Sequence, residues 1–491
     1  MAAKLLLARG ELNSSLLRLR YLNHLDLSGI NSNHGRIPEF IGSIEQLRYL
    51  NLSFTNFHGM VPQQLGNLTK LEVLDLHNDY ESLVVDDILW VSHLQSLKYL
   101  DLSGSMIANE RVLMQLSGVI PSSLGSLPHL NTLHLNRNRL NGELPQALDY
   151  CTGLVILDLG ENNLSGSIPT WFDESFQSLL ILRLRENRFV GSIPPQLCSL
   201  SGLTILDMAV NNLTGAIPHC LGNMSSMINL KQSNLKQSNP FGSVAVTPVQ
   251  DISFYSDLSS LYWDQQHVVE ILKGRYNEYT KIVLRLMVNL DLSSNFLNGS
   301  IPKELSFLSR LHGLNLSYNH LSGNIPICMG NMTSLESLDL SNNHLSGTIP
   351  QGISALTSLA HLNLSQNDLM GQIPKGNQIQ TLDDPSIYAG NPLLCGDLLR
   401  NKCLNAETPQ PQKIPHPEDT HEEDKLDRML FYAIVMLGFA IGFWGFFGVL
   451  QFKKDWRRAY FIFADQAAHK AYVAIVVKVA KLKRLRLLRS M

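Results

Sequence analysis

Leu290-Asp-Leu292-Ser-Ser-Asn295-Phe-Leu297-Asn-Gly299-Ser-Ile301-Pro302 is the first of four copies of one pattern, which together fill residues 287–374. The asparagines of the next copies are Asn319, Asn343 and Asn367, so the pattern repeats every 24 residues or so. In each copy the alternating Leu-x-Leu predicts a short strand that turns its leucines to one side and its intervening residues to the other.

One copy cannot bury its own leucines, so neighbouring copies must stack. The glycine allows a tight bend, Ile-Pro favours an extended return segment, and the asparagine amide can satisfy backbone groups of a neighbouring turn. A period of about 24 residues with this pattern is typical of leucine-rich repeats. We therefore predict an α/β repeat solenoid with a parallel sheet on its concave side.

Residues 1–227 carry earlier copies of the same repeat, although the rhythm is irregular at 71–121. The irregularity fits either two fused half-repeats or an ordinary loop insertion. No polar cap precedes Gly10, and the three leucines before Arg9 are too short an apolar run for a signal peptide. The sequence therefore indicates that the N-terminal cap is missing and that the chain is shortened at this end.

The repeat stops over residues 228–286, which begin polar and turn-rich and then gather several tyrosines around Trp263. An island that interrupts a solenoid must loop off its side, and such insertions often bind a ligand. A disordered spacer is the alternative interpretation of this segment.

The C-terminal part divides into four segments. Residues 375–404 resemble a closing cap, and 405–428 form a proline-rich and acidic linker. Residues 429–452 contain no charge, and a membrane-spanning helix needs roughly 20 apolar residues. The tail at 453–491 is basic, which predicts that it is cytoplasmic and that the repeats lie outside the cell. The tail could also lie on an anionic leaflet as an amphipathic helix.

Four of the six cysteines suggest disulfides. Cys395 and Cys403 flank a short loop in the cap and could pair in an oxidising compartment. Cys198 and Cys220 are separated by nearly one coil, so stacking could bring them together. We expect the other two cysteines to be buried singly.

Composition and motifs argue against catalysis. The formal charge of −3 predicts no affinity for nucleic acid, and the sequence shows no phosphate loop, no HExxH and no metal-ligand cluster. The tail of about 40 residues is too short for a kinase domain. We predict that the protein is not an enzyme and has no metal or cofactor.

The sequence offers candidate positions for glycosylation, ligand contact and helix packing. Ten Asn-x-Ser/Thr sequons suggest a glycosylated ectodomain: Asn13, Asn51, Asn67, Asn163, Asn212, Asn223, Asn298, Asn315, Asn331 and Asn363. Candidate ligand contacts are His134, Arg183 and Arg185, which point outward from predicted strands, and Trp263 of the island. Gly438, Gly442 and Gly445 would let a partner helix approach, although glycine is common in membrane helices.

The chain resembles the plant leucine-rich-repeat receptor-like proteins, which lack a kinase domain. The likeness rests on the repeat with Ile-Pro, the island ending Lys273-Gly274-Arg-Tyr276-Asn-Glu-Tyr279, the cap motif Leu394-Cys395-Gly396, the glycine-rich helix from Gly438 to Gly445, and the tail Lys454-Asp-Trp456. It is similar above all to members that sense microbial elicitors such as xylanase.

The resemblance implies a single-pass type I receptor of the plasma membrane. Its concave repeats and island would bind a microbial elicitor or another apoplastic ligand, its helix would hold an adaptor receptor kinase, and a co-receptor kinase would join on ligand binding. Three alternatives stay open: a developmental receptor for an endogenous peptide, an inhibitor of cell-wall enzymes, and a truncated copy without function.

Overall fold

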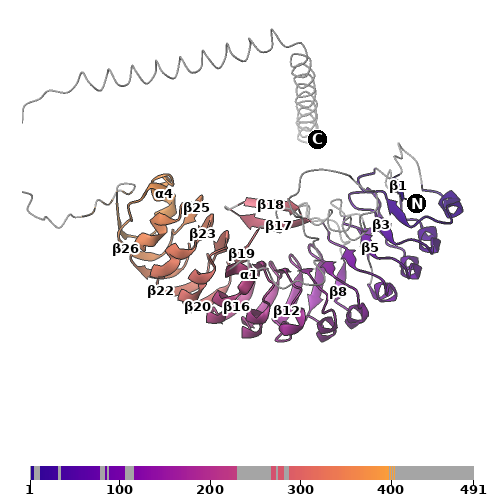
Figure 1. The fold of residues 1–491 in the computed structure, drawn as a ribbon, viewed down its shortest axis with the longest axis horizontal. Coiled ribbons are helices and arrows are strands. Elements are labelled where there is room, and N and C mark those ends of the chain that lie inside the picture. The colour runs from indigo at the N-terminus through magenta and orange to yellow at the C-terminus, as the bar shows by residue number, and fades with distance from the viewer. Residues whose placement is uncertain are drawn as a thin grey trace, which may run out of the picture. The chain divides into compact units, whose positions relative to one another are not determined.

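The computed structural model describes residues 2–4, 12–30, 35–77, 83–85, 88–104, 116–228, 267–272, 275–280, 287–396, 399, 401 and 403. All of them belong to one compact unit, Met1–Leu404. This unit is the predicted leucine-rich-repeat solenoid, in which the repeats stack in chain order (Figure 1).

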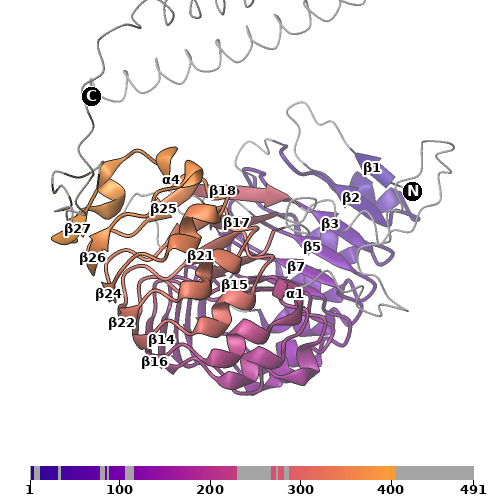
Figure 2. The same cartoon turned by 60° about the vertical axis from the view of Figure 1, so that its left-hand side comes forward.

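A parallel sheet of 13 strands forms the concave side, with one strand from each coil (Figures 1 and 2). Its strands are β1 (Ala2–Lys4), β2 (His24–Asp26), β3 (Tyr49–Asn51), β5 (Val73–Asp75), β7 (Tyr99–Asp101), β9 (Thr132–His134), β11 (Ile156–Asp158), β13 (Ile181–Arg183), β15 (Ile205–Asp207), β19 (Asn289–Asp291), β21 (Gly313–Asn315), β23 (Ser337–Asp339) and β25 (His361–Asn363). The alternating leucines of these strands are buried in one continuous core, as the pattern predicts.

The Gly-x-Ile-Pro half of the repeat forms a second parallel sheet of ten strands. Its strands are β8 (Ser117–Val119), β10 (Arg139–Gly142), β12 (Asn163–Ser167), β14 (Arg188–Ser192), β16 (Asn212–Ala216), β20 (Phe296–Ser300), β22 (His320–Asn324), β24 (His344–Gly347), β26 (Asp368–Gln372) and β27 (Leu393–Cys395). Two short strands pair separately: β4 (Gly59–Met60) and, in the irregular region, β6 (Leu83–Val84).

Each coil returns to the concave sheet through a short 3-10 helix. These helices are η1 (Ser14–Arg18), η2 (Glu39–Ser43), η3 (Gln63–Asn67), η4 (Leu89–His93), η5 (Ser122–Ser126), η6 (Gln146–Tyr150), η7 (Glu174–Phe176), η8 (Pro195–Ser199), η9 (His219–Asn223), η10 (Lys303–Phe307), η11 (Ile327–Asn331), η12 (Gln351–Ala355) and η13 (Pro385–Tyr388). A proline precedes most of them with the extended φ of about −65° that proline imposes. The described residues also form two single-turn α-helices, α1 (Ser225–Ile228) and α4 (Asn377–Gln380).

A ladder of buried asparagines ties neighbouring coils together. The Nδ2 group of Asn319 donates to the carbonyl oxygens of Leu316 and Ser317 in its own coil and of Leu292 in the preceding one. Its Oδ1 accepts from the backbone N–H of Leu297, at 3.0 Å. Each asparagine thus satisfies backbone groups that the bend would otherwise bury without a partner.

The stack continues across the island. Strand β15 pairs directly with β19, and η9 packs against η10, although residues 228–286 separate them in sequence. Gly222 of η9 shows how close the two coils are, because a Cβ atom there would lie 2.2 Å from the carbonyl oxygen of Glu304. Within the island the structure describes one antiparallel hairpin, β17 (His267–Leu272) with β18 (Arg275–Thr280).

Two disulfides are present in the described residues. Cys198 pairs with Cys220 between η8 and η9, with a Cα–Cα distance of 5.7 Å, and Cys395 pairs with Cys403 in the cap. Cys151 is free and buried, whereas Cys328 is free and half-buried.

The described part of the chain contains no helix with the length and apolar composition that crossing a membrane requires. The predicted span at 429–452, with Gly438, Gly442 and Gly445, lies outside the described residues, as do the linker and the tail.

Candidate ligand-binding face

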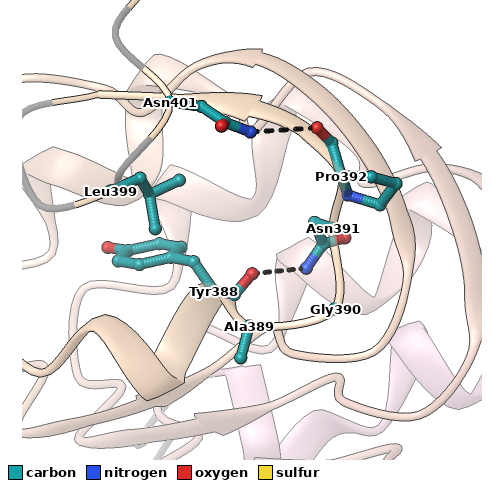
Figure 3. A pocket seen from close by; sticks show the side chains of 7 residues that line it. All are labelled: Tyr388, Ala389, Gly390, Asn391, Pro392, Leu399 and Asn401. Atoms are coloured by element: carbon teal, nitrogen blue, oxygen red, sulfur yellow. Dashed lines mark hydrogen bonds between the residues drawn. The ribbon is translucent and has the colours of Figure 1, made fainter.

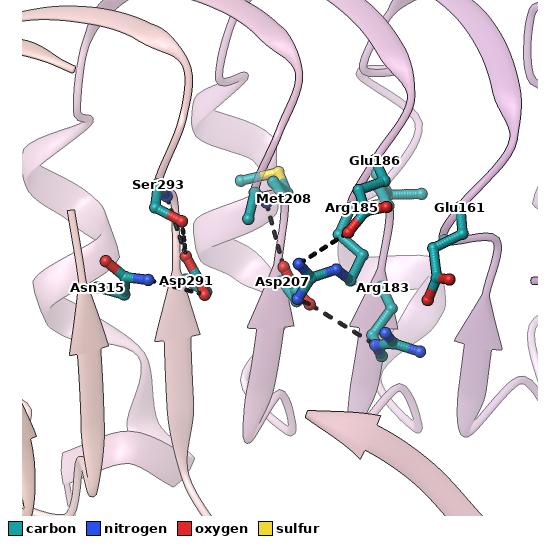
Figure 4. Close-up of polar contacts among 12 residues, drawn as sticks. Glu161, Arg183, Arg185, Glu186, Asp207, Met208, Asp291, Ser293 and Asn315 are labelled. Carbon is teal, nitrogen blue, oxygen red and sulfur yellow. Dashed lines mark hydrogen bonds and ion pairs between the residues drawn. The ribbon is translucent and has the colours of Figure 1, made fainter. Parts of the chain in front are cut away.

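The candidate site is a row of polar side chains at the centre of the concave sheet. Each stands between two buried apolar residues, leucines on both sides except for Met208 after Asp207, and therefore points away from the leucine core. The register places them side by side on consecutive strands, and Figure 4 shows part of the row. We call the following five residues the concave row: His134, Asp158, Arg183, Asp207 and Asp291.

Ion pairs hold the concave row together. Arg183 Nη1 lies 2.6 Å from Asp158 Oδ2, and its Nε lies 3.7 Å from Asp207 Oδ2. Arg185, two residues further along the chain, places Nη1 3.2 Å from the same Asp207 oxygen and Nη2 3.1 Å from Glu186 (Figure 4). Both arginines are 1% exposed, so these pairs are formed away from water.

The electrostatics of Asp158 follow from this arrangement. Burial alone would raise the pKa of its carboxyl group, but the charge of Arg183 and the hydrogen bond and charge of His134 outweigh burial and lower the pKa to about 2. Asp158 is therefore ionised throughout the physiological range, and it is the counter-ion that keeps Arg183 in place.

Two carboxyl groups of the same sheet titrate near neutrality instead. Burial and the neighbouring charge of Asp101 raise the pKa of Asp75 to about 7, and burial and the charge of Asp207 raise the pKa of Asp291 to about 6. In both cases two carboxyl groups are directly opposite each other on adjacent strands.

Apolar side chains adjoin the concave row on the same side of the sheet. Ile156, Ile181 and Ile205 form a small cluster with Val155 and Met287, separate from the leucine core. Tyr49, Val73 and Tyr99 form a second such cluster towards the N-terminus, where the ring of His24 stacks on Tyr49 at 4.0 Å. The centre of the concave sheet thus combines apolar strips with paired charges, all of them buried.

The structure brings together three of the four predicted ligand contacts. His134 of β9 and Arg183 of β13 lie on either side of β11, and Arg185 follows β13. All three are buried and engaged with acidic partners, whereas Trp263 lies outside the described residues. Sequence reasoning missed the acidic partners Asp158 and Asp207. The signal was available, because these residues occupy the same repeat position one coil before and one coil after Arg183.

A cavity of about 250 Å³ lies in the C-terminal cap (Figure 3). Its lining is Tyr388, Ala389, Gly390, Asn391, Pro392, Leu399 and Asn401. The amide of Asn391 donates to the carbonyl oxygen of Tyr388, and burial raises the pKa of the Tyr388 hydroxyl to about 12. The lining carries no carboxylate, imidazole or thiol, so this cavity belongs to the packing of the cap. No cluster of metal-ligating side chains occurs among the residues described above.

Comparison with protein families supports the repeat assignment. The model described as "Leucine Rich Repeat" matches residues 46–68, 129–151, 153–174, 178–200, 202–224, 287–308 and 310–332. A second model, "Leucine rich repeat", matches residues 326–369.

The similar curated proteins are plant receptor-like proteins. Receptor-like protein EIX2 of Solanum lycopersicum is 53% identical over 212 residues, which are 43% of this chain and 20% of that protein. Receptor-like protein 9b of Arabidopsis thaliana is 55% identical over 193 residues, 39% of this chain and 20% of that protein. The matched part thus corresponds to one fifth of the length of each of these relatives.

Among solved structures, the plant peptide hormone receptor RGFR1 in complex with RGF2 is similar in fold. The superposition has a TM-score of 0.53 at 27% identity and covers 79% of this chain and 54% of the receptor.

Proposed function

The chain belongs to the plant leucine-rich-repeat receptor-like proteins, and from that premise we propose that it is a single-pass cell-surface receptor for a microbial elicitor or another apoplastic ligand. The concave sheet supplies the binding face, and residues 429–452 supply the membrane span. The observation that carries the proposal is the continuous sheet of 13 strands with its central concave row, in a chain whose relatives are receptor-like proteins.

Signalling would pass through partner kinases. We propose that the membrane helix holds an adaptor receptor kinase and that a co-receptor kinase joins when ligand binds. A developmental receptor for an endogenous peptide is the second candidate, and the fold similarity to a peptide hormone receptor in complex with RGF2 favours it.

Ligand classes can be separated in plant cells that express the full chain. If the elicitor proposal holds, addition of purified fungal xylanase should produce an oxidative burst that untransformed cells lack. A burst with a fraction of endogenous secreted peptides, and none with xylanase, would favour the developmental receptor. Equal responses in transformed and untransformed cells to both probes would contradict the receptor proposal.

The partner helix can be tested with two glycines of the proposed span. Changing Gly438 and Gly442 together to leucine should strongly reduce co-precipitation of a membrane kinase, because the larger side chains would keep the partner helix from approaching closely. Ala440→Leu, on the opposite side of the helix, is the control and should have little effect. Equal co-precipitation by the double glycine variant and the control would refute a glycine-mediated contact.

The structure also sorts the ten sequons by face, and we expect glycans at a subset. Three exposed sequons end 3-10 helices: Asn67, Asn223 and Asn331. The second sheet carries Asn212 and Asn298, which are exposed, and Asn163, which is half-buried. Asn13 is exposed next to η1. Asn51, Asn315 and Asn363 lie in the concave sheet instead. A glycan would be attached to the Nδ2 atom of the asparagine. In Asn315 this atom donates to the carboxylate of Asp291, and in Asn363 it donates to that of Asp339.

Glycopeptide mass spectrometry on chain purified from plant cells measures this directly. We expect high occupancy at Asn67, Asn212 and Asn331 and less than a tenth of it at Asn51 and Asn315, because a glycan there would break buried hydrogen bonds. Comparable occupancy on the two faces would contradict the proposal that the concave face is kept free for a ligand.

A further inference from the structure

The strands β15 and β19 form a seam between two blocks of repeats. They are the last strand before the island and the first after it, and in the seam Asp207 is the direct partner of Asp291. Both carboxyl groups are at most 1% exposed. The solenoid therefore places two buried acids against each other at the position where the chain is interrupted.

The two acids are held by different partners. Asp207 faces Arg185 at 3.2 Å and Arg183 at 3.7 Å, both from the β13 side. Asp291 accepts from the Ser293 backbone N–H at 3.0 Å and hydroxyl at 2.6 Å, and from Asn315 Nδ2 of β21 at 3.2 Å. Its direct hydrogen-bond donors are thus neutral, while a carboxylate faces it from the next strand (Figure 4).

This asymmetry decides which acid carries the proton. Two arginines compensate a charge on Asp207, whereas a charge on Asp291 would be buried beside that carboxylate and would feel Arg185 only from two strands away. Burial and the Asp207 charge accordingly raise the pKa of Asp291, and Ser293 and Arg185 lower it less. A buried acid beside a compensated carboxylate is most stable when it is neutral.

We propose that the Asp207–Asp291 pair makes the seam between the two repeat blocks proton-dependent, closed while Asp291 is protonated and loosened once it ionises. The folded-state pKa lies above the unfolded value, so the stabilisation is complete in acid and is lost as pH rises through the folded-state value. With a folded pKa of about 6 against 3.8, local opening of the seam should increase about tenfold between pH 5 and pH 7.5. This inference does not rest on the proposed function.

Two other titratable contacts adjoin the seam. His219 Nδ1 of η9 lies 2.8 Å from Glu304 Oε2 of η10, but this ion pair is solvent-exposed on the His219 side and contributes little. The second contact involves His312. His312, next to β21, accepts a hydrogen bond at Nδ1 from the backbone N–H of Val288, just before β19. Burial lowers the pKa of His312, so its protonation would loosen the seam in acid, opposite to the effect of Asp291. Glu186 contacts Arg185, and β21 contributes only the neutral Asn315 next to Asp291.

Hydrogen exchange reports on the seam directly, because backbone hydrogen bonds cross it. The N–H groups of Met208, Val210 and Asn211 donate to the carbonyl oxygens of Asp291, Ser293 and Ser294, and Asn289 N–H donates to the carbonyl oxygen of Thr204. Amide hydrogen exchange of the full chain in detergent would be measured at several pH values. The rates would be corrected for the intrinsic pH dependence of amide exchange. Peptides covering 204–211 and 288–295 would be compared in the wild type, in Asp291→Asn and in Asp339→Asn.

Asp339 is a matched control. It accepts from Ser341 and Asn363 in the same way that Asp291 accepts from Ser293 and Asn315, but asparagines flank it on both neighbouring strands. We expect wild type and Asp339→Asn to lose about tenfold in seam protection from pH 5 to pH 7.5. The Asp291→Asn variant, which mimics the protonated acid, should lose no seam protection over the same pH range.

Two results would overturn the proposal: seam protection in the wild type that is constant over this pH range, or a pH dependence that Asp291→Asn retains. The wild-type profile decides the first point even if the variant does not fold.

Discussion

Asn319→Ala is expected to lower the free energy of unfolding by about 3 kcal/mol or more, one of the two largest effects that the structure predicts. The asparagine is 5% exposed, and alanine would remove three donated hydrogen bonds and the acceptor for Leu297. The buried N–H of Leu297 would lose this acceptor, and an unsatisfied buried group costs about 1–3 kcal/mol. The carbonyl oxygens of Leu292 and Leu316 would each lose one donor but keep those of Asn295 and Asn343.

Urea unfolding of the full chain in detergent measures this effect. Asn324→Ala is the matched control, since Asn324 is exposed at the end of β22 in the same coil. Asn319→Asp separates the two halves of the interaction, because it keeps the acceptor and removes the donors. A loss for Asn319→Ala no larger than that for Asn324→Ala would show that the ladder does not hold the coils together.

Arg183→Met is expected to lower the free energy of unfolding by about 3–5 kcal/mol at pH 7, because Asp158 would be left buried without its main counter-ion. Methionine keeps much of the apolar stem, so packing changes least. The arginine is 1% exposed and lies 2.6 Å from Asp158.

The pH dependence provides a second readout for this variant. In the wild type the folded-state pKa of Asp158 is lowered to about 2 against 3.8, so this stabilisation is present above pH 4 or so and is lost as pH falls towards 2. The difference between wild type and Arg183→Met should therefore shrink in acid. Arg188→Met, at an exposed position of β14, is the control.

A loss of stability equal to that of the control would overturn the structural role of Arg183. If its main role were ligand contact, stability would be unchanged and only the response to ligand would fall. The burial of Arg183 and of its acidic partners favours a role in organising the concave face.

The sequence predicts the concave sheet and the asparagine ladder well, because both depend on residues that recur in every coil. Leu290 and Leu292 mark the strand, and Asn295 marks the bend. It does not predict the second sheet, since a strand such as β20 (Phe296–Ser300) contains one buried leucine and a glycine and shows no strand alternation of its own. The helical element of each coil is a 3-10 turn, too short to produce helical periodicity.

The candidate site was harder to predict, because its chemistry arises between coils. The repeat that contains Arg183 predicts only that its side chain points outward. Its pairing with Asp158 and Asp207 depends on the register in which the coils stack. The contact of Asp207 with Asp291 requires that the stack continue across the island, which periodicity on one side alone does not establish.

The central claim is that the repeats face the cell exterior as the ligand-binding part of a membrane receptor. The most direct test expresses the full chain with a C-terminal tag in plant cells and treats intact protoplasts with protease, followed by glycosidase treatment of the released fragments. The account predicts that glycosylated fragments of the repeats are released while the tag stays protected. Protection of both the repeats and the tag, with no glycan on either, would contradict it.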